Sequence, residues 1–369
     1  MYQANNPNFY CGSDSEKIEQ ALAFAAKNSL PLEITRRCAD DDRDFWLIER
    51  AILLMADSVL NIVDCTIQLA DSCRDNFIRS GNCIVGSKKV EPIENITICG
   101  IGNAVLKGAD IPRSTGDSAK ILGERTFGTD AGKAGENPNG DWRNIGILLA
   151  DVSNFSISNI KIIDQHCWGI SLEYCRHGSL KNIVFDARNS KEINGTRVTI
   201  LNQDGIDLRV GCFNIDIFDI SGWTGDDSVA LTALPLGRGE ALMRVEGKSV
   251  DIHHVDIARV ATFISGGHQT IRLLNHDGAK IHDIKINDIT DATLPEKKPA
   301  RATVVIGDTH YFKERPAKKG ETYNISVWGV DSHALVGLEV RHNNVENLTY
   351  KHVTNPDYTV VRFAEEVTE

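Results

Sequence analysis

One short motif recurs along most of the chain and limits the folds open to it more than any other feature. It is an apolar residue, any residue, an apolar residue, any two residues and another apolar residue, often with Asn or Asp beside it. Copies begin at Asn95, Asn154, His177, Phe213, Ser249, Ala279, Tyr323 and, more weakly, Val345. Strands this short cannot bury their apolar face alone, so successive copies must stack to build a continuous core. The repeat therefore predicts an all-β solenoid, a single-stranded right-handed parallel β-helix.

The spacing of the repeats gives a first estimate of the register between coils. From Ile157 to Leu180 the step is 23 residues, about one coil of a β-helix. The later steps are longer and irregular. They are expected to place Ile217, Ile252, Ile281 and Val327 at equivalent positions of successive coils. Unequal steps place insertions in loops on one or more faces of the solenoid, where a binding site would be built.

A helix is expected at the N-terminal end. The segment that begins at Ser13 carries Ser and Asp at capping positions, and apolar residues follow at helical spacing: Ile18, Ala21, Leu22 and Ala25. Because a solenoid exposes unpaired strand edges at its ends, we expect this helix to cover one of them. The sequence thus predicts one β-helix domain over residues 1–369, with a cap region in 1–30 and the main coils in 93–355.

Charge and hydropathy exclude several classes of partner. The net charge of −11 argues against nucleic acid, because phosphate contacts need clustered Lys and Arg. No stretch approaches the roughly 20 apolar residues that cross a bilayer, so no membrane partner is expected. The first residues lack the pattern of a secretory signal, which predicts a cytoplasmic chain, or a secreted or periplasmic one whose signal has been removed. The oligomeric state stays open.

The densest chemical signal is a pair of acidic motifs one coil apart, LNQDGIDLRV from Leu201 and WTGDDSVAL from Trp223. Asp226 and Asp227 follow Asp204 by 22 and 23 positions, so the three carboxylates are expected to stack. Crowded like charges raise one another's pKa and cost stability, which favours a functional role. A lone Asp at a coil corner often forms an Asx turn instead, and that alternative stays open. Asp207 is expected on the opposite face, bracing a turn.

These motifs resemble a known family. NQDGID followed by GDDSVAL is similar to the NTDGID and GDDCIAL motifs of the polygalacturonases, glycoside hydrolase family 28, and the resemblance covers roughly Ile145 to Ile289. It implies an inverting hydrolase in which Asp226 is the general acid while Asp204 and Asp227 activate water. Inverting hydrolysis needs one protonated carboxyl and another that holds a water, and crowded aspartates can keep such a proton. No cofactor and no metal are expected.

Two further motifs of the family are only partly matched. SGGHQTIRLL resembles the Gly-His-Gly motif and predicts that His268 orients the acid and assists its proton transfer. Where the family has the Arg-Ile-Lys clamp for a uronate carboxylate, this chain has the apolar stretch from Val304 to Ile306. Bidentate carboxylate recognition normally uses Arg, so Arg272 and Arg301 are the candidate replacements.

Some residues are candidates for contacts with the substrate on weaker grounds. Polar or aromatic side chains near the motifs could line sugar subsites: Asn202, Trp168, Trp223 and His310. Aromatic faces stack on sugars, although packing within the coils explains both tryptophans equally well.

Three functions are compatible with these residues. The first is hydrolysis of a polysaccharide or oligosaccharide, a pectin-type or related glycan other than polygalacturonate. The second is a β-helix polysaccharide lyase or a fructan-type transferase; lyases on this fold usually need Ca²⁺ and a proton-abstracting Lys or Arg. The third is a non-catalytic carbohydrate-binding or tailspike-like protein, because function belongs to the site and not to the fold.

Overall fold

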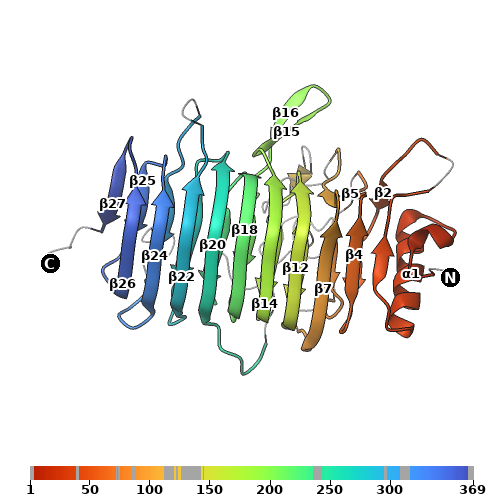
Figure 1. Cartoon of the computed structure of the whole chain (residues 1–369), viewed down its shortest axis with the longest axis horizontal. Coiled ribbons are helices and arrows are strands. Elements are labelled where there is room, and N and C mark those ends of the chain that lie inside the picture. Colours follow the sequence, from red (N-terminus) through yellow and green to blue (C-terminus); the bar gives the residue numbers. More distant parts are fainter. Residues whose placement is uncertain are drawn as a thin grey trace.

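The protein folds as a parallel β-helix with one helix at its N-terminal end (Figure 1). The computed structural model describes residues 4–38, 41–71, 73, 75–84, 89–111, 120–121, 124–125, 143, 145–235, 243, 245–294, 297–307 and 316–364. Two long sheets run along the molecule, and their strands pair in parallel with the equivalent strands of the preceding and following coils. The predicted right-handed parallel β-helix is confirmed.

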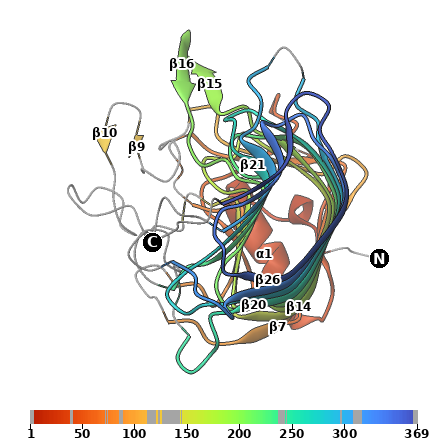
Figure 2. The same ribbon diagram turned by 90° about the vertical axis from the view of Figure 1, so that its left-hand side faces the viewer.

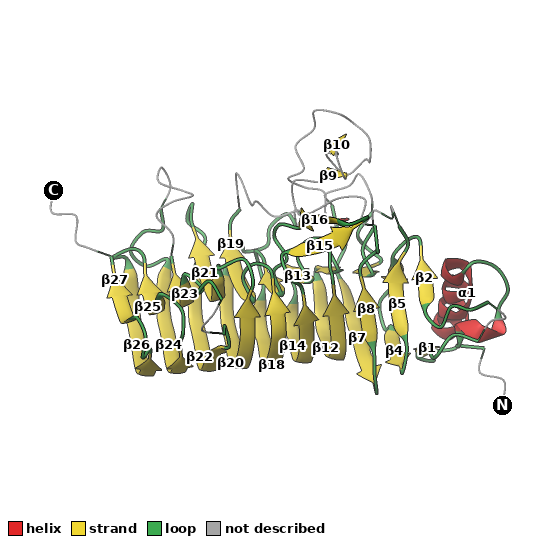
Figure 3. Cartoon of the chain, turned by 90° about the horizontal axis from the view of Figure 1, so that it is seen from above, coloured by secondary structure: helices red, strands yellow, loops and turns green. Residues whose placement is uncertain are grey.

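The larger sheet, called sheet A here, has 13 strands. Its main path is β1 (Leu32–Ile34), β4 (Val59–Val63), β7 (Ile93–Ile101), β12 (Val152–Ile163), β14 (Arg176–Asp186), β18 (Phe213–Thr224), β20 (Ile252–Ile264), β22 (Ile281–Asp291), β24 (Thr322–Asp331) and β26 (Val345–Thr354). Off this path lie β2 (Trp46–Ile48), β5 (Thr66–Leu69) and β8 (Val105–Lys107). Figure 3 shows these strands side by side along the length of the protein.

The second long sheet, sheet B, has 10 strands. They are β3 (Ile52–Leu54), β6 (Ile78–Ser80), β11 (Ile147–Ala150), β13 (Ile170–Glu173), β17 (Ile206–Leu208), β19 (Val229–Ala233), β21 (Gln269–Asn275), β23 (Ala302–Ile306), β25 (Val336–Val340) and β27 (Thr359–Phe363). Two antiparallel pairs lie outside the coils: β9 (Lys120–Ile121) with β10 (Glu124–Arg125), and β15 (Ser190–Ile193) with β16 (Thr196–Thr199). The second pair projects away from the sheets (Figure 1).

The core consists of apolar rows that run across the coils. Figure 2 shows the coils in a view turned by 90° from that of Figure 1, with the strands of the sheets stacked one behind another. Ile157 pairs with Leu180 and Leu180 with Ile217, as the repeat predicts. The next predicted step is wrong, because Ile217 pairs with Ile257. Likewise Val327 pairs with Ile286 and not with Ile281. Each long strand offers inward residues five positions apart, such as Ile252 and Ile257, and the apolar pattern alone does not distinguish them.

The Asn and Asp residues of the repeat bend the long strands of sheet A. Asn154, Asn214 and Asp283 have φ angles of 56°, 53° and 55°, in the left-handed region. Asn, Asp and His tolerate this conformation better than other residues with a side chain. Their side chains also join neighbouring coils, since Nδ2 of Asn347 donates to Oδ1 of Asn324 at 3.1 Å. The polar position of the repeat is therefore a structural requirement of the coil.

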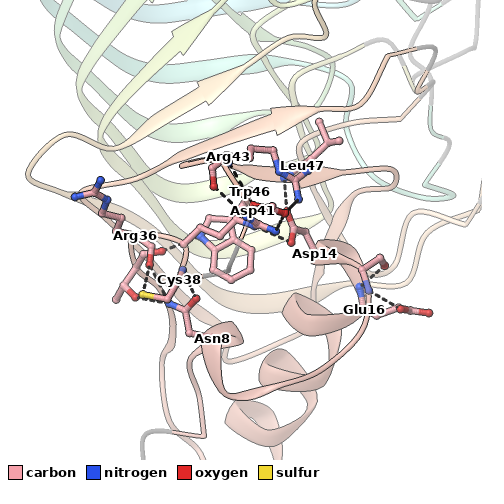
Figure 4. Close-up of polar contacts among 12 residues, drawn as sticks. Asn8, Asp14, Glu16, Arg36, Cys38, Asp41, Arg43, Trp46 and Leu47 are labelled. Atoms are coloured by element: carbon pink, nitrogen blue, oxygen red, sulfur yellow. Dashed lines mark hydrogen bonds and ion pairs between the residues drawn. The ribbon is translucent and has the colours of Figure 1, made fainter.

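The N-terminal helix α1 (Asp14–Lys27) follows the short 3₁₀ turn η1 (Pro7–Phe9). Ser13 and Glu16 form the predicted capping box, and the buried face includes Ile18, Ala21 and Ala25. Asp14 fixes the helix to the first coils (Figure 4): it accepts hydrogen bonds from Nε of Arg37 at 3.0 Å and from the N–H of Leu47 at 2.8 Å. In the described part of the chain no helix is long and apolar enough to span a membrane.

Candidate active site

The aspartates singled out by the motifs lie where the chain enters sheet B. The N–H of Gly205 donates to the carbonyl oxygen of Asp227, and the N–H of Gly169 donates to that of Asp204, both at 2.9 Å. Trp168, Asp204 and Asp227 therefore follow one another across consecutive coils. The stacking predicted from the 23-residue spacing is present.

Asp204, Asp226 and Asp227 are called the aspartate cluster here. Asp226, together with His268, forms its more exposed part. Nδ1 of His268 lies 2.8 Å from Oδ1 of Asp226, and their side chains are 29% and 13% exposed. Burial lowers the pKa of His268, but the hydrogen bond to Asp226 and the charges of Asp226 and Asp227 raise it above the ordinary value. The ring therefore stays protonated to a higher pH than free histidine and donates to Asp226.

Asp227 is buried, and the protein satisfies both of its oxygens. Oδ1 accepts a hydrogen bond from the N–H of Gln269 at 3.0 Å, and Oδ2 accepts one from Nη1 of Arg272 at 3.2 Å. Burial raises the pKa of Asp227, whereas the positive charge of Arg272 opposes that rise. The predicted clamp residue Arg272 thus contacts an aspartate of the cluster.

Asp204 is 7% exposed, and its Oδ1 has no hydrogen-bond partner among the described residues. Burial raises the pKa of Asp204 well above its ordinary value, and the charges of Asp207, Asp226 and Asp227 raise it further. A carboxyl in this environment keeps its proton at a pH where free aspartate has lost it.

Asp207 belongs to the same cluster, and the prediction that it lies on the opposite face is wrong. It is 2% exposed and stands on β17 between Ile206 and Leu208, which both point into the core. Burial raises its pKa well above the ordinary value, and the charge of Arg209 opposes that rise. The error arose because Asp204 precedes β17, so strand alternation does not run unbroken between the two aspartates. An Asp between two core residues of a strand must face outward, and that signal could have placed it.

Two other predicted residues lie next to the cluster. Trp168 is half-buried in the coil before Asp204, and the guanidinium carbon of Arg209 lies 4.6 Å from the centroid of its ring. Arg301 is exposed, its N–H donates to the carbonyl of His268 at 2.9 Å, and its charge lowers the pKa of that histidine. Arg301 is therefore the candidate clamp residue that stands beside His268 and open to solvent.

The remaining predicted residues are less closely tied to the cluster. Trp223 stacks on Phe263 with ring centroids 4.6 Å apart, and the guanidinium carbon of Arg188 lies 3.9 Å from the centroid of a Trp223 ring, so packing accounts for much of its surface. Asn202 is half-buried, with a left-handed φ of 53°, two residues before Asp204. His310 lies outside the described residues.

The apolar stretch that replaces the clamp does not line the site. Val304 and Ile306 point into the main core, and Val305 is fully buried with Ala302 and Val336 in a smaller apolar cluster. No cation therefore occupies the outward position of β23, and in the part of the chain that the structure describes Val305 is covered by other apolar residues.

One group of atoms in the cluster has the spacing that a metal ion could bridge. Single donor atoms of Asp226, Asp227 and His268 lie within 4.8 Å of one another. Within the protein, His268 is hydrogen-bonded to Asp226, and both oxygens of Asp227 accept N–H groups. The geometry is that of a hydrogen-bonded acid–base cluster.

Comparison with known proteins supports the fold. No family model and no curated protein sequence matches the chain. Among solved structures, the family 28 exopolygalacturonase of Yersinia enterocolitica matches with a TM-score of 0.51 and 12% identity, over 98% of this chain and 78% of that one. A tailspike protein mutant of E. coli bacteriophage HK620, solved with a pentasaccharide, matches with a TM-score of 0.55 and 11% identity, over 97% of this chain and 61% of that one. This chain thus spans less than two thirds of the tailspike, and at these identities the similarity shows the fold.

Proposed function

We propose that this protein is a glycoside hydrolase that cleaves a polysaccharide or oligosaccharide by aspartate-based acid/base chemistry with inversion. The observation that carries the proposal is the aspartate cluster with His268 bonded to Asp226. Several carboxyls crowded against one another and shielded from water cost folding free energy, and such groups concentrate at catalytic sites. The fold is shared with an exopolygalacturonase and with a tailspike that holds a pentasaccharide, which supports a glycan as the ligand.

The two kinds of carboxyl have different roles in this proposal. Asp226 is the acid, because it is more exposed than Asp227 and can reach a leaving oxygen while His268 orients it. Asp204 and Asp227 activate the attacking water. In this proposal the proton that burial retains on Asp204 moves to Asp226 when the substrate is bound, which leaves Asp204 ionised as a base, and the ion pair with Arg272 favours the carboxylate form of Asp227.

Stereochemistry is the most direct test of the acid and base pair. Inverting enzymes usually separate their two carboxyls by roughly 6.5–9.5 Å, whereas oxygens of Asp226 and Asp227 lie within 4.8 Å. Asp204, from the coil before, is then the better partner of Asp226 across a sugar. Proton NMR of the first anomer released distinguishes the outcomes, and a product of retained configuration would contradict this pairing.

The proposed substrate is a pectin-type or related glycan, and unmodified polygalacturonate is expected to be a poor substrate. The outward-facing residue of β23 is the uncharged Val305. Arg272, its neighbour on the next strand of sheet B, is paired with Asp227. A uronate bound at the cleavage point would therefore lack a dedicated cation, unless Arg301 supplies one.

A product assay on a panel of pectic, rhamnose-containing and neutral oligosaccharides tests the activity. New reducing ends without an unsaturated-uronate chromophore support hydrolysis. The chromophore would show a lyase, and binding without any product would show a carbohydrate-binding protein.

A further inference from the structure

Arg272 brings a positive charge into the aspartate cluster from the next coil. It lies on β21 opposite Ala230 of β19, and its Nη1 is 3.2 Å from Oδ2 of Asp227. The two side chains are 16% and 1% exposed. Because little water screens a pair this buried, the charge of Arg272 strongly affects the protonation of Asp227.

The charge of Arg272 acts on several carboxyls of the cluster. It opposes the rise in pKa that burial causes in Asp227, and it does the same at Asp204 and Asp207. Among the residues that the structure describes, the charged and titratable groups that interact with Asp227 are Asp204, Asp207, Asp226, His268 and Arg272. Of these, only Arg272 is a permanent cation, and it is the one bonded to Asp227.

We propose that Arg272 is a positioning residue that holds Asp227 in place as the ionised carboxylate, and that it is not a clamp for a carboxylate of the substrate. This inference rests on the proposed hydrolase function. A uronate clamp needs a guanidinium whose paired donors face the sugar, whereas one donor of Arg272 is committed to a buried aspartate. The role of Arg272 is therefore to keep Asp227, one of the two proposed bases, ionised.

The first experiment measures the charge of Asp227 without any substrate. The carboxyl carbon of Asp227 is followed by NMR during a pH titration, with the signal assigned from Asp227→Asn. In Arg272→Gln the midpoint should move up by at least about one pH unit, because the stabilising cation is gone. In Arg272→Lys, which keeps the charge, the shift should be smaller. An unchanged midpoint in Arg272→Gln overturns the proposal.

A matched control is available at the end of β25, which belongs to the same sheet. Arg341 forms a similar pair with Glu339, with Nη2 and Oε2 2.8 Å apart and side chains 23% and 14% exposed. Arg341→Gln should leave the Asp227 titration where it is in the unmodified protein. If Arg272→Gln does not fold, the titration of Arg272→Lys decides. A midpoint of Asp227 that moves up by less than the shift expected for Arg272→Gln supports the proposal. An unchanged midpoint together with an altered affinity for the substrate overturns it.

Kinetics then separate positioning from clamping. For positioning, the acidic limb of the kcat profile of Arg272→Gln moves to higher pH and kcat at neutral pH falls at least about tenfold, while KM changes less than about threefold for uronate-containing and neutral oligosaccharides alike. A clamp would instead raise KM for uronate-containing substrates alone. If no glycan is cleaved at all, the hydrolase proposal fails, and the NMR titration still decides the role of Arg272 in holding Asp227.

Discussion

Replacing Asp204 by Asn should make the protein more stable at neutral pH, and increasingly so as the pH rises. The carboxyl is buried with an oxygen that has no partner among the described residues, and its pKa is raised well above the ordinary value by burial and by Asp207. Above the unfolded value of about 3.9, the folded protein therefore holds a proton that the unfolded chain has lost. Stability then falls with pH by about 1.4 kcal/mol per pH unit for that proton, until the pH passes the raised folded value.

Asparagine cannot ionise, so the variant should escape this loss. Over two pH units within the window its advantage reaches about 3 kcal/mol, while below about pH 4 the two proteins should differ little. Denaturant unfolding from about pH 4 to about pH 8 at constant ionic strength measures the difference. Asp288→Asn, at an exposed position of β22, is the matched control and should follow the unmodified protein. Parallel curves for Asp204→Asn would refute the reasoning, because they would mean that the carboxyl is ionised in the folded state.

Three other outcomes are expected. Asp226→Asn should lower kcat about 10²–10⁴-fold and leave folding and ligand binding nearly unchanged, and full activity would place the acid elsewhere. Unmodified polygalacturonate should be cleaved roughly a hundredfold less efficiently than rhamnose-containing or neutral oligosaccharides, since an unpaired buried uronate costs several kcal/mol; equal cleavage would show that Arg301 replaces the clamp. Asp14→Ala should lower the free energy of unfolding by about 1.5–3 kcal/mol, because Asp14 is buried and accepts hydrogen bonds from Arg37 and from the N–H of Leu47, while Asp41 still pairs with Arg37; a loss below about 1 kcal/mol in denaturant unfolding, roughly the level of an exposed pair, would contradict this.

The repeat predicted the architecture well because apolar spacing reports directly on which residues face the core. Ile157, Leu180 and Ile217 stack as expected, and the capping box at Ser13 starts the only α-helix in the described residues. The predicted register is wrong at Ile252, because the segment before this strand is long and both Ile252 and Ile257 face the core, so the apolar pattern fits either of them. The first coils gave no clear repeat because strands such as β2 and β3 have only three residues each.

The sequence placed Asp204, Asp226 and Asp227 together, but it misplaced Asp207 and did not predict the surroundings of the cluster. The spacing of Asp204 and Asp227 follows from coil length, which is a local property. The pairing of Arg272 with Asp227 depends on how a long side chain lies across two coils, and spacing along the chain does not reveal that. Likewise the burial of Val305 depends on what covers sheet B, which no periodicity predicts.

The hydrogen-bond ladder between Gly169, Asp204, Gly205 and Asp227 has a consequence for how such a protein can change over time. The ladder sets the distance between the carboxyls, and the loops between coils do not contribute to it. Loops can therefore lengthen, shorten or be exchanged without moving the aspartates. New ligands can therefore be tried on an unchanged arrangement of aspartates, both in evolution and in the laboratory, and one residue inserted within β17 should displace the aspartates more than ten inserted between coils.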